Sequence, residues 1–380
     1  MGAICSAGKE ENGLEARYSV AGQLGKGSQG TVFACVDRAT GRECAVKVLD
    51  TSKASAWNTF RREVDLCAEA AGCPYVVEVL EHFSGYSSYS VVMPRYETHL
   101  RAALKASALS PGSGFALEDA PLRRIIAQAL SALVHLHSHE IVHRDVKAQN
   151  FLTDRADVRD EKCNIILSDF GLARKLPIGQ HLSAAVGTRK YWAPDVYKKK
   201  YSHNVDIFAV GVLIFLAASG TYPYQSEEQT RTLDVFEAGT VPTALTQDAR
   251  DFMRACLRKD FQERPSSWEM LARPWTSEVR VATGPLAKRR GQDARRGGEA
   301  DAPHAEVLVK GTNSSDSGGE DTSASELSSS TEASSCTSAS EAPRDAEAPP
   351  GRLLDMASCA GAVAAHPGAG RSLAPLPGWS

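Results

Sequence analysis

Two short segments in the middle of the chain constrain its fold most strongly, because each carries charged and amide side chains at fixed spacings. They are His143-Arg144-Asp145-Val146-Lys147-Ala148-Gln149-Asn150 and Ser168-Asp169-Phe170-Gly171. Phosphoryl transfer requires an attacking hydroxyl held in line and a transferred charge that metal ions neutralise. A carboxylate at Asp145 can accept the hydroxyl hydrogen bond, and Lys147 can neutralise the moving group. Asn150 and Asp169 supply the hard oxygen ligands that magnesium prefers. We do not expect this combination in an unrelated fold.

An earlier segment, Gly25-Lys26-Gly27-Ser28-Gln29-Gly30, has the glycine spacing of a phosphate-binding loop. A dinucleotide site uses the same spacing, but it needs a helix directly after the glycines to direct its dipole at the pyrophosphate. Here residues 31–36 (TVFACV) follow, and they are typical of a strand. A glycine-rich hairpin can lay its backbone N–H groups over phosphates, because no side chains hold it away. An ordinary hairpin is the alternative interpretation of this segment.

Lys47, in the strand-like segment Ala45-Val46-Lys47-Val48, is expected beneath this glycine hairpin, where it could reach two phosphates of ATP. Its flexible stem needs a fixed anionic partner. Glu63 lies at a suitable distance on a predicted helix, and Glu69 is the rival candidate. These residues could also be solvated surface charges, so they do not by themselves decide between the alternatives.

The spacing of apolar residues predicts two lobes of different character, and therefore an α+β fold. Residues 18–93 alternate apolar and polar side chains, as strands do, except for residues 56–70, which have helical spacing. Residues 122–137 and 205–218 are also helical in pattern. Pro94 makes a continuous element between the two parts unfavourable. A small strand-rich lobe with one helix is thus followed by a larger helical lobe.

Composition changes near residue 276. Beyond this point Trp379 is the only aromatic residue, and residues 314–340 are nearly all small and polar. Such a segment cannot bury enough apolar surface to offset the entropy lost on ordering. We therefore predict that residues 276–380 form a disordered tail.

The net charge and the cysteines indicate which partners and which cellular compartment to expect. The formal net charge of −3 gives no bulk attraction to nucleic acid, so no nucleic-acid partner is expected. The 9 cysteines include no C-x-x-C pair and no His/Cys cluster at zinc-ligand spacing. We therefore expect buried, reduced thiols and an intracellular protein. The longest apolar run, residues 207–218, is shorter than the roughly 20 residues that span a bilayer.

Residues 18–275 resemble the eukaryotic protein kinase family, because they carry its signature motifs in its order. The resemblance implies a bilobal protein kinase fold that transfers the γ-phosphate of ATP to protein substrates, with Mg²⁺ as the second cofactor. It implies that Asp145 is the catalytic base, assisted by Lys147, and that Asn150 and Asp169 bind the metal.

The same resemblance pairs Lys47 with Glu63 and with the ATP phosphates. The further nucleotide-binding positions that it implies are Gly25, Lys26, Gly27, Ser28, Gly30, Val32, Ala45, Met93 (the gatekeeper position) and Leu152.

Lys147, together with residues 187–191 (GTRKY), is similar to the serine/threonine branch of the family. Thr188 would then support the base and the substrate hydroxyl. Arg264-Pro265-Ser266 and Arg273-Pro274-Trp275 resemble calmodulin-dependent-type kinases, although the subfamily stays open. Gln149 stands where kinases that prefer basic substrates often carry Glu, so a strong demand for basic substrates is not expected.

Two other functions compete with an active serine/threonine kinase. One is a catalytically inactive kinase fold that acts as a scaffold at the membrane. Such a scaffold usually lacks the strand lysine, the base or a metal ligand, whereas this chain retains all of them. The other is tyrosine specificity, which Lys147 and Thr188 disfavour.

Three departures from the family pattern concern the helical lobe. The family's Ala-Pro-Glu is Ala193-Pro194-Asp195 here, so an ion pair with Arg264 would be one methylene shorter on the acid side. Phe208 replaces a Trp, which keeps an aromatic anchor but loses its N–H donor. Residues 152–167 are longer than the usual hairpin, and their many charged residues predict a loop that bulges into solvent.

Arg144 directly precedes the expected base, and in kinases of this type such an Arg commonly binds a phosphate on the activation segment, here residues 169–195. Ser183 and Thr188 are the candidate acceptors, and we favour Ser183 because Thr188 is expected at the substrate. A phosphate of about −1.5 to −2 charges would order the segment through Arg144.

The first residues, Met1-Gly2-Ala3-Ile4-Cys5-Ser6, fit the pattern for N-myristoylation at Gly2. A single myristoyl chain binds membranes only marginally, so a stable anchor needs a second signal, and palmitate on Cys5 could supply it. We therefore predict a lipidated segment over residues 1–17 and a location at the cytoplasmic face of a membrane, with the plasma membrane as the expected one. A chance glycine after the initiating Met is the alternative.

Overall fold

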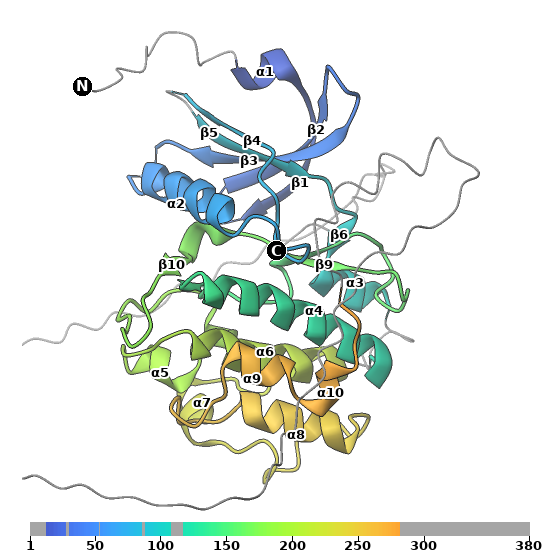
Figure 1. Ribbon diagram of the computed structural model, residues 1–380, viewed down its shortest axis with the longest axis vertical. Coiled ribbons are helices and arrows are strands. Elements are labelled where there is room, and N and C mark those ends of the chain that lie inside the picture. Colours follow the sequence, from blue (N-terminus) through green and yellow to red (C-terminus); the bar gives the residue numbers. More distant parts are fainter. Residues whose placement is uncertain (1–12, 28–29, 53, 86–87, 108–116, 282–380) are drawn as a thin grey trace, which may run out of the picture. The chain divides into compact units, whose positions relative to one another are not determined.

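The alternating residues of the N-terminal lobe form a five-stranded antiparallel sheet in the order β1-β2-β3-β5-β4. Its strands are β1 (Tyr18–Gly27), β2 (Gly30–Asp37), β3 (Glu43–Asp50), β4 (Glu81–Ser84) and β5 (Ser88–Pro94), and helix α1 (Gly13–Arg17) precedes them. The computed structural model (Figure 1) describes residues 13–27, 30–52, 54–85, 88–107 and 117–281. Gly2 and Cys5 and almost all of the predicted tail therefore lie outside the described residues.

The glycine segment is part of a hairpin, as the strand-like residues after it predict. β1 pairs with β2 up to Gly27 and Gly30, and no helix follows the glycines. Gly30 has a φ of +154°, and a Cβ at this position would lie 2.4 Å from the carbonyl oxygen of Val48. Glycine is therefore required where the hairpin passes close to β3.

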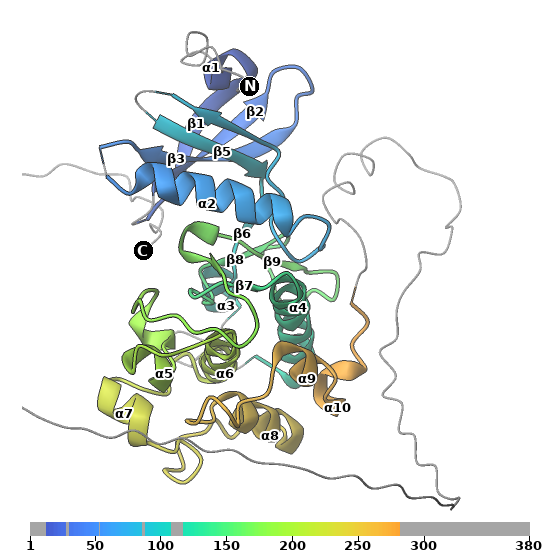
Figure 2. The same ribbon diagram turned by 60° about the vertical axis from the view of Figure 1, so that its left-hand side comes forward.

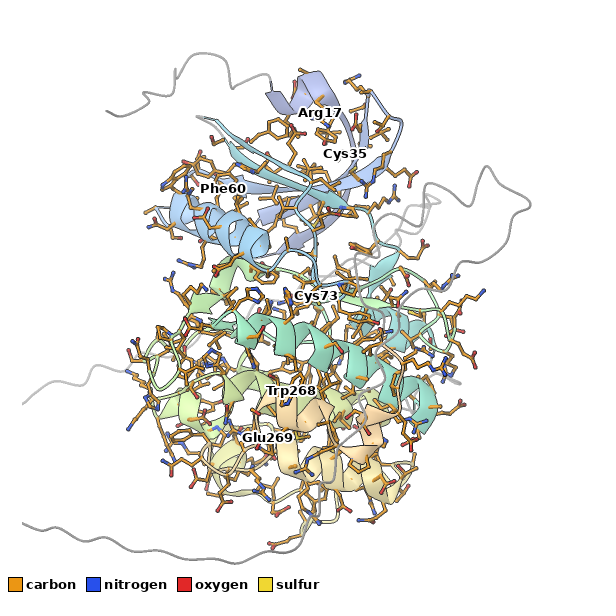
Figure 3. The ribbon with its side chains drawn as sticks, viewed as in Figure 1. Arg17, Cys35, Phe60, Cys73, Trp268 and Glu269 are labelled. Atoms are coloured by element: carbon orange, nitrogen blue, oxygen red, sulfur yellow. The ribbon has the colours of Figure 1, made fainter. Side chains whose placement is uncertain are left out.

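Helix α2 (Ala56–Glu69) lies along one face of this sheet (Figure 2), and its bounds agree with the predicted helix over residues 56–70. Phe60, Glu63 and Cys67 are buried on one face of the helix, as residues three and four apart share a face. The ring of Phe60, which is labelled in Figure 3, stacks on Tyr89 of β5 with 5.1 Å between centroids. This apolar packing holds Glu63 toward the sheet.

Helices dominate the C-terminal lobe, as predicted. They are α3 (Leu100–Ala106), α4 (Asp119–Ser138), α5 (Pro194–Tyr197), α6 (Asn204–Ser219), α7 (Glu227–Thr232), α8 (Gln247–Cys256), α9 (Ser267–Leu271) and α10 (Pro274–Ser277), with the 3₁₀ turns η1 (Phe170–Leu172) and η2 (Arg189–Tyr191). α6 is buried on all sides, because its residues 207–218 are apolar throughout. Among the described residues, no helix is both long and apolar enough to cross a membrane.

Short strands flank the loops that carry the candidate site, since Asp145 and Asn150 lie between β7 and β8 and Asp169 follows β9. They are β6 (Thr98–His99), β7 (Ile141–Val142), β8 (Phe151–Thr153), β9 (Ile165–Leu167) and β10 (Arg174–Lys175), paired as β6-β8-β9 and β7-β10. β5 ends at Pro94, where the sequence predicts a break. The bilobal α+β fold expected from the sequence is confirmed.

The loop between β8 and β9 differs from the prediction that it bulges into solvent. Val158 and Cys163 are fully buried within it. Two residues of α4 hold the loop, since Arg124 donates to the carbonyl of Val158 over 2.6 Å and the amide oxygen of Gln128 accepts from the N–H of Ile165. Two apolar side chains among many charged ones were enough to fold the loop back onto the lobe.

Buried cysteines agree with the expectation of reduced thiols. Cys35, Cys44 and Cys256 are free and buried. Burial raises the pKa of the Cys35 thiol to about 11 and that of Cys256 to about 12, so both stay protonated and unreactive at neutral pH.

The ordered chain continues past the expected boundary at residue 275, because Thr276 is buried and donates to the carbonyl of Met270 over 2.9 Å.

The shortened acid of the Ala-Pro-Asp motif still reaches its predicted partner. Asp195 Oδ1 accepts from Arg264 Nη2 over 2.9 Å, while the second contact, from Nη1 to Oδ2, is longer at 3.5 Å. Both side chains are almost fully buried. The guanidinium of Arg264 also lies 5.1 Å from the ring centroid of Phe208, so the aromatic anchor on α6 packs against the same ion pair.

Removing one member of this pair should destabilise the lobe strongly. In Asp195→Ala, the charge of Arg264 is left buried without its partner, and we expect the free energy of unfolding to fall by about 3–5 kcal/mol. Urea unfolding of the full chain measures the loss. The matched control is Asp251→Ala, which removes an exposed acid paired with Arg254 at 3.7 Å and should cost at most about 1 kcal/mol. Equal losses in the two variants would contradict the assignment.

Candidate active site

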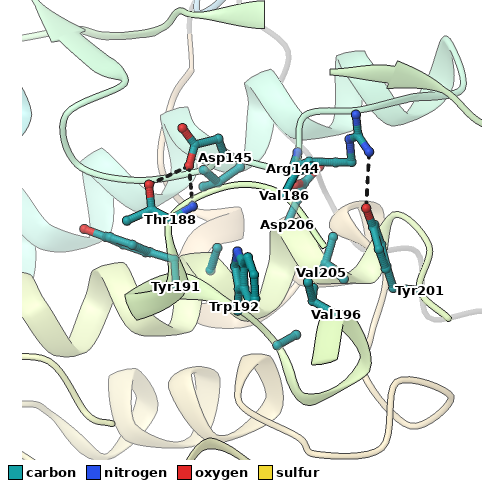
Figure 4. A pocket seen from close by; sticks show the side chains of 13 residues that line it. Arg144, Asp145, Val186, Thr188, Tyr191, Trp192, Val196, Tyr201, Val205 and Asp206 are labelled. Carbon is teal, nitrogen blue, oxygen red and sulfur yellow. Dashed lines mark hydrogen bonds between the residues drawn. The ribbon is translucent and has the colours of Figure 1, made fainter. Parts of the chain in front are cut away.

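The carboxylate of Asp145 is the centre of the site, and four hydrogen bonds hold it. Oδ1 accepts from the hydroxyl of Thr188 over 2.8 Å and from its backbone N–H over 2.9 Å (Figure 4). Oδ2 accepts from Lys147 Nζ over 2.8 Å and from the Asn150 amide over 3.2 Å. The sequence placed these four residues together, and the structure brings them into direct contact.

Lys147 links the base to the activation segment. Its ammonium donates both to Asp145 and to the hydroxyl oxygen of Thr188, the second over 3.1 Å. The hydroxyl of Thr188 thus accepts from a cation and donates to a carboxylate. All of these hydrogen bonds form together only when the Lys147 ammonium, the Thr188 hydroxyl and the Asp145 carboxylate each take one orientation. The network therefore fixes the position of the carboxylate.

The backbone around the base is shaped by Asp206, a buried acid in the first turn of α6. Its carboxylate accepts from the N–H groups of His143 over 2.8 Å and Arg144 over 2.9 Å, and contacts a ring nitrogen of His137 at 3.1 Å. Arg144 has a φ of +66°, a conformation rarely adopted by a residue with a side chain. Burial would raise the pKa of Asp206, but these hydrogen bonds and nearby histidines outweigh burial and lower it.

Lys47 occupies a second cluster, between the two lobes. Its ammonium lies 2.8 Å from both carboxylate oxygens of Glu63 and 2.7 Å from Oδ1 of Asp169. Glu69, the rival partner, instead forms an ion pair with Lys175. The strand lysine therefore contacts Glu63 and not Glu69.

Burial and charge act in opposite directions on the Lys47 cluster. Burial favours a neutral amine, but the charges of Asp169 and Glu63 outweigh it and raise the pKa of Lys47 above its ordinary value. Burial likewise opposes the charge on Asp169, yet the Lys47 cation lowers the pKa of that carboxyl. Burial raises the pKa of Glu63. Lys47 and Asp169 are thus held in their charged forms.

The second motif is anchored by its aromatic residue. Phe170 is fully buried, and its ring meets that of His143 edge-to-face at 5.3 Å. Arg62 of α2 donates to the carbonyl of Gly171 over 2.6 Å, so the helix also holds this segment. Asp169 is thereby turned toward Lys47, with a φ of +68°.

The remaining predicted nucleotide positions that the structure describes lie on the five-stranded sheet, except for Leu152, which lies on the separate β6-β8-β9 sheet. Ala45 and Met93 are buried and directly opposite each other in β3 and β5, and Val32 is opposite Lys47 in β2 and β3. Leu152 on β8 is half-buried. Gly25, Lys26, Gly27 and Gly30 lie in the β1–β2 hairpin, and Ser28 lies outside the described residues.

The residues present fit a magnesium ion held partly by a nucleotide. The amide nitrogen of Asn150 donates to Asp145, which leaves its amide oxygen for a cation. Asp169 uses Oδ1 for Lys47, which leaves Oδ2. Within the described ranges, no group of three His, Cys, Asp or Glu residues could hold a metal by itself. Magnesium suits such a site, because it keeps waters and binds substrate phosphates alongside one or two protein oxygens.

Some residues of the site were not foreseen as such. Arg62 and Tyr201 had no local signal, because their partners are carbonyls and side chains from distant segments. Gly187 stands within the segment that the sequence singled out, but its role is steric. Its φ is +97°, and a Cβ there would lie 2.3 Å from the carbonyl oxygen of Arg144. The two backbones touch where Thr188 approaches the base.

Residues 18–276 match the family model described as protein kinase domain. This chain belongs to the protein kinase family. Curated relatives of the kinase include the serine/threonine-protein kinase fused of Drosophila melanogaster, 28% identical over 79% of this chain and 35% of that protein. Calcium-dependent protein kinase 27 of Oryza sativa subsp. japonica is 30% identical over 70% and 44% of the two chains, and calcium-dependent protein kinase 33 of Arabidopsis thaliana 26% identical over 69% and 50%. The kinase thus spans half or less of these relatives' lengths.

Loss of the Thr188 hydroxyl should weaken the kinase without unfolding it. Thr188→Val keeps the shape but removes a hydrogen bond to a charged carboxylate, a contribution of about 1.5–3 kcal/mol, so phosphoryl transfer should fall roughly 10- to 150-fold. Steady-state kinetics with a generic protein substrate measure the loss. Thr188→Ser keeps the hydroxyl and should retain most of the activity. If the two variants were equally active, the hydroxyl would not support the base.

Proposed function

We propose that this kinase transfers the γ-phosphate of ATP to serine and threonine hydroxyls of protein substrates. One observation carries the proposal: Asp145 is held by Thr188 and Lys147 while its carboxylate remains next to the loop that would receive a substrate. A carboxylate fixed in this way can accept the proton of an attacking alcohol.

The protein residues divide the reaction between them. Asp145 orients the substrate hydroxyl and accepts its proton as the new oxygen–phosphorus bond forms and ADP departs. Lys147 offsets the negative charge beside the base, and Lys47, itself held by Glu63 and Asp169, is placed to bind phosphate oxygens. Asn150 and Asp169 would hold magnesium, which neutralises charge on the transferred group.

Serine/threonine specificity is supported by the contact between Lys147, Asp145 and Thr188. In this arrangement the Lys147 ammonium and the Thr188 hydroxyl both contact the carboxylate of Asp145. The printed name of one relative, the serine/threonine-protein kinase fused, points the same way. Tyrosine specificity has no comparable support.

The Asp145→Asn variant tests the proposal. Without the base, label transfer from radiolabelled ATP to a mixture of proteins should fall about 10²- to 10⁴-fold. Binding of magnesium-ATP should persist and stabilise the variant in a thermal shift assay, because a ligand of the folded state raises its stability. The matched control, Asp65→Asn on the exposed face of α2, should transfer label as the unmodified kinase does.

The alternative hypothesis, a catalytically inactive scaffold, predicts the opposite result when the unmodified chain is measured in the same assays. No label would reach any protein even after full activation, and millimolar magnesium-ATP would leave its melting temperature unchanged. Either result would favour the scaffold over the enzyme.

We further propose that a phosphate on Ser183 activates the kinase through a group of arginines. Arg62, Arg144 and Arg174 come from α2, the base loop and β10, and in the described part of the chain no carboxylate lies within 4.0 Å of their guanidinium groups. Burial, followed by the charges of Arg174 and Arg144, lowers the pKa of Arg62, as expected where cations crowd together. A phosphate would relieve that repulsion.

The proposal is supported by Tyr201, which links the two chain neighbours of Ser183 to Arg144. Leu182 and Tyr201 exchange backbone hydrogen bonds, and the carbonyl of Ala184 accepts from the Tyr201 hydroxyl over 2.5 Å. The same hydroxyl accepts from Arg144 over 3.2 Å (Figure 4).

Ser183→Ala should therefore lower the activity of kinase purified from its own cells by at least about 10-fold, since the charge-assisted bonds to phosphate cannot form. Phosphatase treatment should reduce the unmodified kinase to the level of this variant. Ser19→Ala, in exposed β1 sequence, is the control and should behave as the unmodified kinase. Unchanged activity in Ser183→Ala would remove this role.

Lipid anchoring at Gly2 and Cys5 stays a prediction, as does the location at a membrane. Intact mass measurement of kinase from its own cells should show a myristoyl group that Gly2→Ala lacks, and the variant should leave the membrane fraction because palmitate alone gives one anchor. A Gly2→Ala protein that stays with the membranes would refute the anchor.

A further inference from the structure

Two cationic side chains stand directly beside the residue that holds the base. Arg189 and Lys190 follow Thr188, whose hydroxyl and N–H both bond Asp145. Successive Cα atoms are about 3.8 Å apart, so both residues lie within roughly 8 Å of Thr188 along the chain. Any peptide that presents a hydroxyl to Asp145 must place its neighbouring residues close to them.

The backbone that carries these cations is fixed. Tyr191, the last residue of η2, is buried, and its hydroxyl accepts from the N–H of Ala148 over 3.3 Å. Its ring also meets Tyr222 edge-to-face at 5.6 Å. Arg189 and Lys190 themselves are exposed. Figure 4 shows Thr188, Tyr191 and Trp192 on this segment beside Asp145.

Neutral groups orient both cations without cancelling their charge. Lys190 donates to the side-chain oxygen of Gln225 over 2.7 Å and lies 5.9 Å from the ring centroid of Tyr222. The guanidinium of Arg189 lies 5.7 Å from the ring of Trp192. No carboxylate among the described residues comes within 4.0 Å of either cation, and Glu227, on the helix after Gln225, is paired with Arg231.

A third cation extends the same surface. The guanidinium of Arg101, on α3, lies 5.5 Å from the centroid of the Tyr222 ring that Lys190 also approaches. Gln149, beside the metal-binding Asn150, contributes an amide where a carboxylate would attract positive residues. With Arg189 and Lys190 not paired to any carboxylate of the described residues and an amide at Gln149, the surroundings of the base favour negative rather than positive substrate side chains.

We propose that this kinase selects serine and threonine residues that have a negatively charged residue within two or three positions, and that Arg189 and Lys190 bind that charge. The anion is a carboxylate or a phosphate already present on the substrate, since both match a guanidinium. The inference rests on the proposed function, because it concerns the substrate class of the same site.

The chain itself contains hydroxyl residues of this kind. Ser325-Glu326, Thr331-Glu332 and Ser340-Glu341 occur in the part of the sequence beyond the described residues. A synthetic peptide of residues 322–342 is therefore a natural probe for the proposed specificity.

The test compares peptides that differ only in the charge beside one serine. The full-length kinase is assayed with a neutral parent peptide, with versions that carry aspartate, phosphoserine or lysine on either side of the serine, and with the peptide of residues 322–342. We expect kcat/KM to be about 10-fold higher for the aspartate peptides than for the parent, chiefly through KM, and the advantage to shrink as salt is added. A larger gain for phosphoserine than for aspartate would identify phosphate as the preferred anion.

Charge reversal locates the effect. In the double variant Arg189→Glu/Lys190→Glu, the preference should invert, so that lysine peptides are labelled more efficiently than aspartate peptides. The matched control is Arg38→Glu/Arg42→Glu, which makes the same charge change in the turn between β2 and β3. This turn is at the end of β2 that is far from the glycine hairpin. It should keep the preference for aspartate.

The outcomes separate this inference from the proposed function. If the unmodified kinase labels neutral and aspartate peptides equally, or prefers lysine peptides, the selectivity is refuted and the kinase activity stands. If it labels no peptide and no protein, both fall. If the aspartate preference persists unchanged in the reversed variant, Arg189 and Lys190 do not bind the charge.

Discussion

One buried carboxylate underlies the geometry of the whole site. Asp206 lies in the first turn of a helix whose residues 207–218 are apolar throughout, and its charge is tolerated only because the backbone of His143 and Arg144 and the ring of His137 surround it with donors. In return, the acid holds Arg144 in an unfavourable backbone conformation. The loop that carries the base is therefore shaped from beneath by the core of the larger lobe, and not by the loop's own sequence.

The second cluster joins the two lobes by charge. Lys47 comes from the sheet, Glu63 from α2 and Asp169 from the segment after β9. The contacts of one ammonium therefore depend on the relative positions of all three elements. Lys47 and Asp169 are both held in their charged forms, and Asp169 keeps Oδ2 available for a cation beside the ammonium that would bind phosphate oxygens. The same cluster would therefore hold magnesium and the nucleotide next to each other.

Much of this site was readable from the sequence because the chemistry is concentrated in short segments. Asp145, Lys147 and Asn150 lie within one loop, and their contacts follow from their spacing. From the residues alone Glu69 stayed a rival to Glu63, because both were expected on one helix. The family resemblance selected Glu63, and the packing of Phe60 against the sheet turns Glu63 toward Lys47. Of the arginine group the sequence indicated Arg144 alone. Arg62, Arg174 and Tyr201 were out of reach, since each comes from a different segment and carries no motif of its own. The prediction for the loop after β8 was wrong because its many charged residues suggested a solvent-exposed bulge. The burial of Val158 and Cys163 instead packs the loop against the lobe.

Gly187 shows how the parts communicate. With no side chain between them, the activation segment and the loop bearing the base meet backbone against backbone. A shift of the activation segment would therefore move the backbone next to Asp145 directly, because no side chain lies between the two. The position of residues 169–195 and the geometry around Asp145 are therefore coupled through a direct contact between two backbones.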